Sequence, residues 1–158
     1  TQAGLDIQYL RGDSTLKAEP VRRSGQYDRL GSASTYRAGV LGIEHNIYGI
    51  MNGGHDIVLL GEYARDSRKD LAHSGLQNDL TFGGRWLWND FEDTEVLGLL
   101  THDLDNGAQT MTVSIDRRIS EEVTFQASAR GTSRYASDPN STALQKDSTV
   151  IMALTYRF

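Results

Sequence analysis

Side chains suited to acid–base or nucleophilic chemistry are scattered along this 158-residue chain. Its histidines are His45, His55, His73 and His102. No two of them have the H-x-x-x-H or H-E-x-x-H spacing that places zinc ligands on one helix face. A nucleophile–base pair would have to join His102 to Ser114 or Ser128, which are predicted on the opposite strand face, or use His73-Ser74 in a loop. The chain also lacks cysteine, so we predict no catalytic, cofactor-binding or metal-binding residues.

Acidic residues gather in two places, where calcium binding would be the chemistry to consider. The two groups are Asp66, Asp70 and Asp79, and Asp103, Asp105 and Asp116. Calcium needs six or more converging oxygens, and neither group has the D-x-D-x-D-G spacing of a calcium loop. We therefore interpret these residues as solvated. The alternative is that they bridge to lipopolysaccharide through divalent ions.

Basic residues are interspersed with acidic ones, and the formal net charge is −5. No basic stripe is present, so we expect no nucleic-acid partner. The one basic run, Arg22-Arg23 with Lys17 and Arg29, falls in a stretch predicted as a loop. These cations either pair with phosphates of surface lipid or belong to a solvated, mobile loop.

The elements that would position these side chains are β-strands. Apolar residues alternate with period two from Leu80 to Trp88, from Met111 to Ile115 and from Val123 to Ala129. No run of about 18 apolar residues is present, so no transmembrane helix is expected. We predict one domain over residues 1–158, with eight strands at roughly 2–11, 36–47, 55–65, 77–89, 94–104, 108–118, 121–132 and 147–158.

The predicted connections also follow a pattern. Connections 12–35, 66–76 and 133–146 are long and polar, and most of the others are short. Outer-membrane barrels have short periplasmic turns and longer external loops. The pattern therefore predicts that the three long loops face outside and that both chain ends lie on the periplasmic side. The mean hydropathy of −0.47 agrees, because half of each strand in such a barrel faces a polar interior.

The last ten residues, TVIMALTYRF, form the most informative segment. Every second residue from Val150 to Phe158 is apolar, and the opposite set is mixed and includes Arg157. Such a strand suits lipid on one side and a wet interior on the other. The segment resembles the C-terminal signal of bacterial outer-membrane β-barrels, which has a terminal Phe, an aromatic residue two positions earlier and alternating hydrophobic residues upstream.

A longer stretch, from Phe82 to Gly131, resembles the C-terminal part of a group of uncharacterised porin-like outer-membrane barrels. The matching features are Asn89-Asp90 closing a strand, Thr94-Glu95 opening the next, Asp103-Leu104-Asp105 before a tight hairpin, Arg117-Arg118 before a short turn, and Tyr156-Arg157-Phe158 at the end. Members of that group are longer than this chain. The resemblance therefore implies the C-terminal half of a larger barrel, placed in the bacterial outer membrane by the barrel-assembly machinery, which reads the last strand.

The fold class expected from these patterns is an all-β, antiparallel, up-and-down transmembrane β-barrel with about eight strands. Its charged side chains would line the lumen, because buried charges in a dry core would need full pairing. The lining candidates are Arg85, Glu95, Asp103, Asp116, Glu122, Arg130 and Arg157. The aromatic residues expected to anchor the barrel at the membrane interface are Trp86, Trp88, Tyr156 and Phe158.

The leading functional hypothesis is a porin-like barrel that passes or binds small solutes, needs no cofactor and contacts outer-membrane lipid and lipopolysaccharide. Further strands or chains would complete it. Three alternatives remain open. One is a complete eight-stranded barrel without a pore, with a structural or surface-interaction role. The second is a lipid-modifying outer-membrane enzyme. The third is a soluble barrel of the lipocalin kind, with apolar side chains inside.

Overall fold

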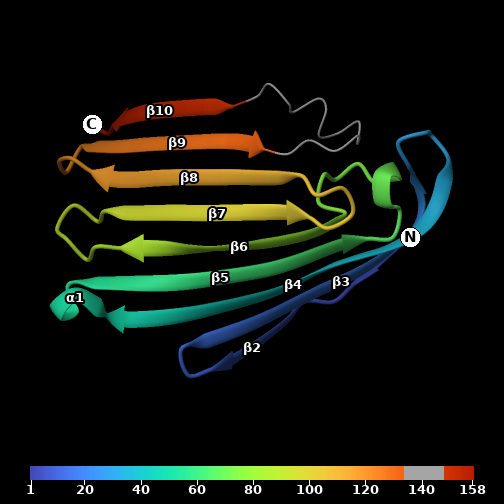
Figure 1. Cartoon of the computed structure of the whole chain (residues 1–158), viewed down its shortest axis with the longest axis horizontal. Helices are drawn as coiled ribbons and strands as arrows, with labels where there is room; N and C mark the ends of the chain where they lie inside the picture. Colours follow the sequence, from blue (N-terminus) through green and yellow to red (C-terminus); the bar gives the residue numbers. More distant parts are fainter. Residues whose placement is uncertain (134–147) are drawn as a thin grey trace.

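The computed structural model describes residues 1–133 and 148–158, which form one antiparallel β-sheet (Figure 1). Each strand from β3 to β10 pairs with the next along the chain, in up-and-down order, and both β1 and β2 pair with β3. The strands are β1 (Gln2–Gly4), β2 (Ile7–Arg11), β3 (Ser14–Tyr27), β4 (Ala33–Gly49), β5 (His55–Asp66), β6 (Asn78–Leu87), β7 (Glu95–Asp103), β8 (Gln109–Arg118), β9 (Val123–Ser133) and β10 (Thr149–Tyr156).

Helical structure in the described residues is limited to two short segments, α1 (Ile50–Gly53) and the 3₁₀ turn η1 (Lys69–Leu71). Met51 and Asn52 in α1 have positive φ, so this segment is a tight turn between β4 and β5 rather than a regular helix. Neither segment approaches the length of an apolar helix that crosses a membrane.

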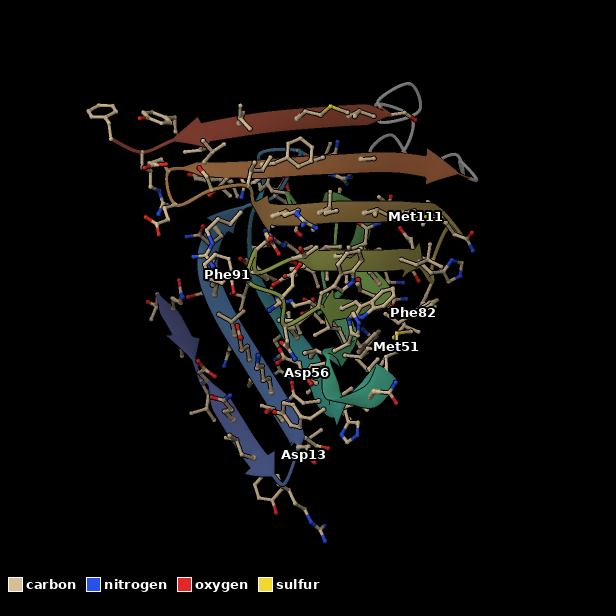
Figure 2. The ribbon with its side chains drawn as sticks, turned by 90° about the vertical axis from the view of Figure 1, so that its left-hand side faces the viewer. Asp13, Met51, Asp56, Phe82, Phe91 and Met111 are labelled. Atoms are coloured by element: carbon tan, nitrogen blue, oxygen red, sulfur yellow. The ribbon has the colours of Figure 1, made fainter. Side chains whose placement is uncertain are left out.

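One face of the sheet, which we call the apolar face, carries large hydrophobic side chains on every strand from β2 to β10. In the pairing register, Ile43, Gly61, Phe82, Leu100 and Met111 stand opposite one another on β4 to β8. Phe82 and Met111 project from the same side of the ribbon in Figure 2. Another row on the same face, nearer the turn end, is Ile47, Ile57, Trp86, Val96, Ile115, Ala127 and Met152.

The opposite face, which we call the polar face, follows from the same alternation. One register row across it is Lys17, Gly42, Glu62, Thr81, Thr101, Thr110 and Thr132. Because successive side chains point to opposite faces of a strand, this row cannot mix with the apolar one. The sheet is therefore amphipathic from one edge to the other.

Many large side chains of the apolar face are exposed, unlike the core residues of a water-soluble protein. Phe82 is 51% exposed, Met111 58% and Met152 72%. The buried hydrophobic residues number three, Tyr36, Ala64 and Ala72, among the described part of the chain, whereas six buried residues are polar or charged. Contiguous apolar area of this size on a surface marks contact with a membrane or a partner.

The two ends of the sheet differ in their connections (Figure 1). We call the end with α1, the 88–94 and 119–122 connections and the C-terminus the turn end, because the longest described connection, 67–77, lies at the other end. The other, the loop end, carries the 28–32, 67–77 and 104–108 connections and the N-terminus. The prediction that both chain ends lie on one side is therefore wrong. Of the predicted loop 133–146, residues 134 onward lie outside the described residues.

The structure corrects the sequence prediction most strongly over residues 12–35, which were expected to form a loop. Residues 14–27 are strand β3, whose proline and charged residues concealed the alternation. Pro20 lies opposite the break between β1 and β2, where its carbonyl accepts a hydrogen bond from the Leu5 amide (3.1 Å). Proline is tolerated there because no backbone N–H is needed at this position to bond a neighbouring strand. The added strand, and the division of 2–11 into two, give ten strands instead of the eight predicted.

The all-β, antiparallel, up-and-down architecture is confirmed, but the sheet does not close on itself. Among the described residues, β10 pairs with β9 alone, and β1 and β2 pair with β3 alone. Residues 1–133 and 148–158 thus do not form a closed eight-stranded barrel, which was one of the arrangements expected from the sequence. Both edges offer unpaired backbone groups, which in natural proteins are usually covered or paired.

Candidate functional site

The polar face is organised by cross-strand contacts between charged or polar side chains. Lys17 on β3 donates to Glu44 on β4 (2.5 Å), and Arg85 on β6 pairs with Glu95 on β7 (3.0 Å). Toward the turn end, Gln126 on β9 donates to Asp116 on β8 (2.5 Å). These side chains are only partly buried, so they remain hydrated while they hold their positions.

Hydroxyl groups lie between these charged pairs. Thr81 and Thr101 share a hydrogen bond of 2.9 Å between β6 and β7, and Thr110 and Thr132 share one of 3.2 Å between β8 and β9. A hydroxyl group both donates and accepts hydrogen bonds. This part of the face can therefore hold water or a polar solute without preference for either charge.

The polar face is hollowed where β3, β4, β5 and β6 meet. A cavity of 340 Å³ lies there, lined by Lys17, Glu44, Glu62 and Thr81 among others. Glu62 has no ion pair among the described residues, in contrast to Glu44. The hollow therefore carries an excess of negative charge in a space large enough for a small solute and its water.

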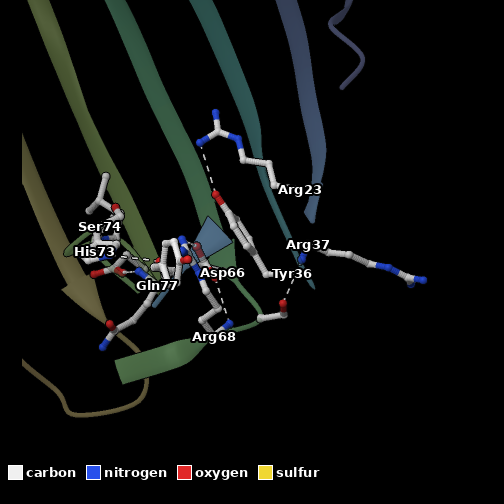
Figure 3. Close-up of polar contacts among 12 residues, drawn as sticks. Arg23, Tyr36, Arg37, Asp66, Arg68, His73, Ser74 and Gln77 are labelled. Atoms are coloured by element: carbon white, nitrogen blue, oxygen red, sulfur yellow. Dashed lines mark hydrogen bonds and ion pairs between the residues drawn. The ribbon is translucent and has the colours of Figure 1, made fainter. Parts of the chain in front are cut away.

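At the loop end, the 67–77 connection is fastened to the sheet by one cluster (Figure 3). The Arg68 guanidinium donates to both carboxylate oxygens of Asp66, at 3.0 and 2.6 Å, and its Cζ lies 3.5 Å from the centroid of the Tyr36 ring. The Tyr36 hydroxyl in turn lies 3.3 Å from Nη1 of Arg23. Hydrogen bonding to Asp66 raises the pKa of Arg68, so the arginine stays charged.

The same connection is held at its second end by buried polar contacts. Gln77 is 1% exposed; its backbone amide donates to Asp79 Oδ2 (2.7 Å), and its carbonyl accepts from the Asp66 amide (2.8 Å). Ala72, in the middle of the connection, is fully buried. The 67–77 segment is thus packed against the end of the sheet instead of extending into solvent.

A second cavity, of 790 Å³, lies beside this packed segment. Its floor is the polar face of β3 to β5, with Val21, Ala38 and Ala64, and its walls include Arg23 and Ser74. It lies closer to the loop end than the 340 Å³ hollow, so a solute that approached the polar face from the loop end would meet it first. The arrangement suits a vestibule with mixed apolar and charged walls.

Five of the seven residues predicted to line a lumen share the polar face of the sheet. These are Arg85, Glu95, Asp103, Asp116 and Arg130. Glu122 and Arg157 lie just beyond the strands at the turn end, where the Arg157 amide donates to the Glu122 carbonyl (2.8 Å). Their part in a lumen stays a prediction, as does that of the other five.

The four predicted anchoring aromatics form two pairs, both at the turn end. The Trp86 and Trp88 rings lie 5.8 Å apart between centroids, and the Tyr156 and Phe158 rings lie 6.4 Å apart and stacked. Trp86 and Tyr156 belong to the apolar face. The pairs are therefore placed where a membrane interface would meet the sheet if the apolar face contacted lipid.

Several polar-face residues were missed by the sequence analysis. Lys17 and Arg23 were assigned to a loop because β3 was not recognised, and Tyr36 and Arg68 meet only through the path of the 67–77 segment. The signal that could have revealed β3 is the alternation of the polar residues Thr15, Lys17 and Glu19 with the apolar residues Leu16 and Ala18.

The structure does not bring the considered serine and histidine residues together. His102 lies on the apolar face, whereas Ser114 and Ser128 lie on the polar face. His73 Nε2 contacts the Tyr27 carbonyl (3.2 Å), and Ser74 accepts from the Leu76 amide (3.1 Å). No group of three or more metal-ligating side chains with suitable geometry occurs within residues 1–133 and 148–158.

Comparison of the chain with protein-family models, curated proteins and solved structures gives no significant match. The functional argument therefore depends on the geometry of the sheet and on the residues of its two faces.

Proposed function

We propose that this sheet forms part of the wall of a bacterial outer-membrane β-barrel, with the polar face lining a porin-like path that passes or binds small solutes. The observation that carries the proposal is the apolar face, on which Leu41, Phe82 and Met111 are 58%, 51% and 58% exposed, against 38% and 36% for the side chains of the charged pair Lys17 and Glu44 on the polar face. In water this arrangement would cost about 25 cal/mol for each Å² of apolar area left exposed. In a bilayer the same area is favourable, and the polar face stays wet.

Strand length and the free edges also support the proposal. The strands from β5 to β10 are 8 to 12 residues long, close to the ~9–11 residues that a tilted strand needs to cross a bilayer. A sheet within a bilayer must have no free edge, because unpaired backbone groups are costly there. The barrel would be closed by further strands that pair with β10 and with the β1–β2 edge. The assembly machinery would recognise β10.

A pair of substitutions on β8 tests the orientation. Val113 faces the apolar side and Ser114 the polar side. In a bilayer, Val113→Arg should destabilise the folded protein by about 2–4 kcal/mol, and Ser114→Arg should cost much less. Reversible unfolding from lipid vesicles measures both. If the two variants were equally stable, the apolar face would not be in contact with lipid.

A conductance measurement tests the path itself. Purified protein added to a planar bilayer should give steady ion current, and the current should depend on the polar-face charges. Heat-modifiable gel mobility of the same preparation reports a folded barrel. A protein that inserts and shows heat-modifiable mobility but no current would have a filled interior and a surface or structural role.

A further inference from the structure

Three arginines without acidic partners stand together on the apolar face at its loop end. Arg22 on β3 and Arg37 on β4 are directly opposite each other in the register. Arg65 on β5 is paired with Gly39, two residues from Arg37, and so is a diagonal neighbour on the same face. All three are exposed, and none makes an ion pair within the described part of the chain.

This arrangement is unfavourable without a bound anion. Like charges directly opposite on neighbouring strands destabilise a sheet. Elsewhere in the sheet, arginines close to one another are supplied with carboxylates: Arg117 has Asp90 and Glu92, and Arg118 has Asp93. Arg22, Arg37 and Arg65 at the loop end therefore lack the counter-charge that Arg117 and Arg118 at the turn end possess.

Shallow grooves connect these arginines to the apolar surface. One, of 600 Å³, is lined by Arg37 and Arg65 together with Pro20, Leu41 and Tyr63. Another, of 370 Å³, lies on the opposite side of Arg37 and reaches Arg22. In Figure 3 the Arg37 side chain extends away from Tyr36 and Arg23, so it does not contribute to the cluster on the polar face.

Ser67 completes the polar end of the larger groove. Its hydroxyl oxygen accepts a hydrogen bond from the Arg37 amide (3.0 Å), which leaves its hydrogen free to donate. Two guanidinium groups and one hydroxyl donor suit a phosphate, because the planar fork of arginine matches its oxygens. The groove floor beyond them, with the 58% exposed Leu41, suits an alkyl chain.

We propose that Arg22, Arg37 and Arg65 bind the phosphate of a phosphorylated lipid, with one of its acyl chains lying along the groove beside Leu41 and Tyr63. The inference rests on the proposed function, since it takes the apolar face to be in contact with lipid. It adds the kind of lipid and the end of the sheet at which the headgroup binds. A bound phosphate with a charge of about −1.5 to −2 would offset the repulsion between Arg22 and Arg37.

The direct test uses phosphatidic acid as the probe, because it carries a phosphate monoester and two acyl chains. The full chain, folded in micelles of an uncharged detergent, should bind phosphatidic acid saturably in native mass spectrometry. Diacylglycerol with the same chains lacks the phosphate and should bind at least about tenfold more weakly, because it loses the charge-assisted hydrogen bonds. Inorganic phosphate should compete poorly, because it lacks the acyl chains. Full competition at equal concentration would show a free-anion site and overturn the lipid assignment.

The variant test removes the charges and keeps the surface polar. The triple variant Arg22→Gln, Arg37→Gln, Arg65→Gln should lose at least about tenfold in affinity for phosphatidic acid, in proportion to the ion pairs removed. Arg11→Gln is the matched control, since Arg11 is an exposed arginine near the opposite end of the same face. In lipid-free micelles, Arg22→Gln alone should not lower the melting temperature, because it removes a repulsion. Equal affinity of the triple variant and Arg11→Gln would refute the site.

Insertion into vesicles separates this inference from the proposed function. If the protein inserts into phosphatidylcholine vesicles but shows no preference for phosphatidic acid, the phosphate site is wrong and the membrane proposal stands. If the protein fails to insert into phosphatidylcholine vesicles with or without phosphatidic acid, the membrane proposal is wrong, and the proposed lipid site is wrong as well.

Discussion

The guanidinium of Arg68 lies 3.5 Å above the ring of Tyr36 while it donates two hydrogen bonds to Asp66. One side chain from the 67–77 connection therefore contacts both β4 and β5. Because the Asp66 and Arg68 side chains are only 5% and 10% exposed, the charges are poorly screened and depend on each other.

We predict that Arg68→Ala will release the 67–77 connection from the sheet. It leaves the buried Asp66 carboxylate without its charged partner, with the backbone amide of residue 68 as the remaining donor at that position, and loss of one partner of a buried ion pair typically costs about 3–5 kcal/mol. The loss should appear as faster proteolysis within residues 67–77 and as a lower melting temperature. The double variant Asp66→Asn, Arg68→Gln should be less damaging than Arg68→Ala, because no charge remains unpaired. If both variants lose the same stability, the ion pair does not hold the segment.

A second prediction concerns the close approach of β6 and β7 at Gly83. A Cβ atom at Gly83 would clash with the Gly98 carbonyl oxygen, whereas a Cβ at Gly98 would meet nothing within 4 Å. Gly83→Ala should therefore destabilise the sheet by at least about 1–3 kcal/mol, the usual cost of overpacking. Gly98→Ala should be close to neutral. Denaturant unfolding of both variants provides the comparison, and equal stabilities would mean that the two strands can move apart without cost.

How much of this structure can be anticipated from sequence depends on whether local alternation is visible. It is clear on β6, β8 and β9 and less regular on β7, and on this basis the four strands and the shared face of Arg85, Glu95 and Asp116 were predicted. It fails at β3, because Pro20 is a strand residue only where β1 and β2 leave a gap opposite it. That placement depends on residues 14 or more positions earlier in the chain, so it is a tertiary effect.

The loop-end cluster illustrates the same limit in a different way. Tyr36 and Arg68 are 32 positions apart, and nothing in their neighbouring residues indicates a contact. Their meeting follows from the pairing of β4 with β5 and from the buried contacts of Gln77 and Ala72. Whether the sheet closes could likewise not be predicted from the sequence, because closure depends on strand number and register and not on alternation.

The Arg85–Glu95 pair gives a prediction for ion selectivity, if the polar face lines a water-filled path. Arg85→Gln leaves the Glu95 carboxylate unpaired and should shift the reversal potential in a salt gradient toward cation preference. Glu95→Gln should shift it toward anion preference, and the double variant should lie near the wild type. The paired comparison separates charge from structure, because a purely structural effect would move both single variants in the same direction.

The last prediction concerns Asp90 in the connection between β6 and β7, where stability should depend on pH. The Asp90 carboxylate accepts hydrogen bonds from the Thr94 hydroxyl (2.6 Å) and amide (2.7 Å). Both bonds lower the pKa of Asp90 below its usual 3.8, and the hydroxyl bond has the larger effect. A carboxylate with a lowered folded-state pKa adds stability that is fully present above its unfolded-state pKa. That stability is lost as the pH falls through the lower, folded-state value.

Acidification below pH 3.8 should therefore loosen this connection, which also carries the Trp88 amide bonded to the Thr94 carbonyl (3.0 Å). The measurement is tryptophan fluorescence of the folded protein between neutral pH and strongly acidic pH. Asp90→Asn should remove most of the change in this acidic range, because no carboxylate remains to be protonated. Asp93→Asn, which alters an exposed carboxylate of the same connection, is the control and should retain the transition. A transition of equal size in Asp90→Asn would assign it to other carboxylates.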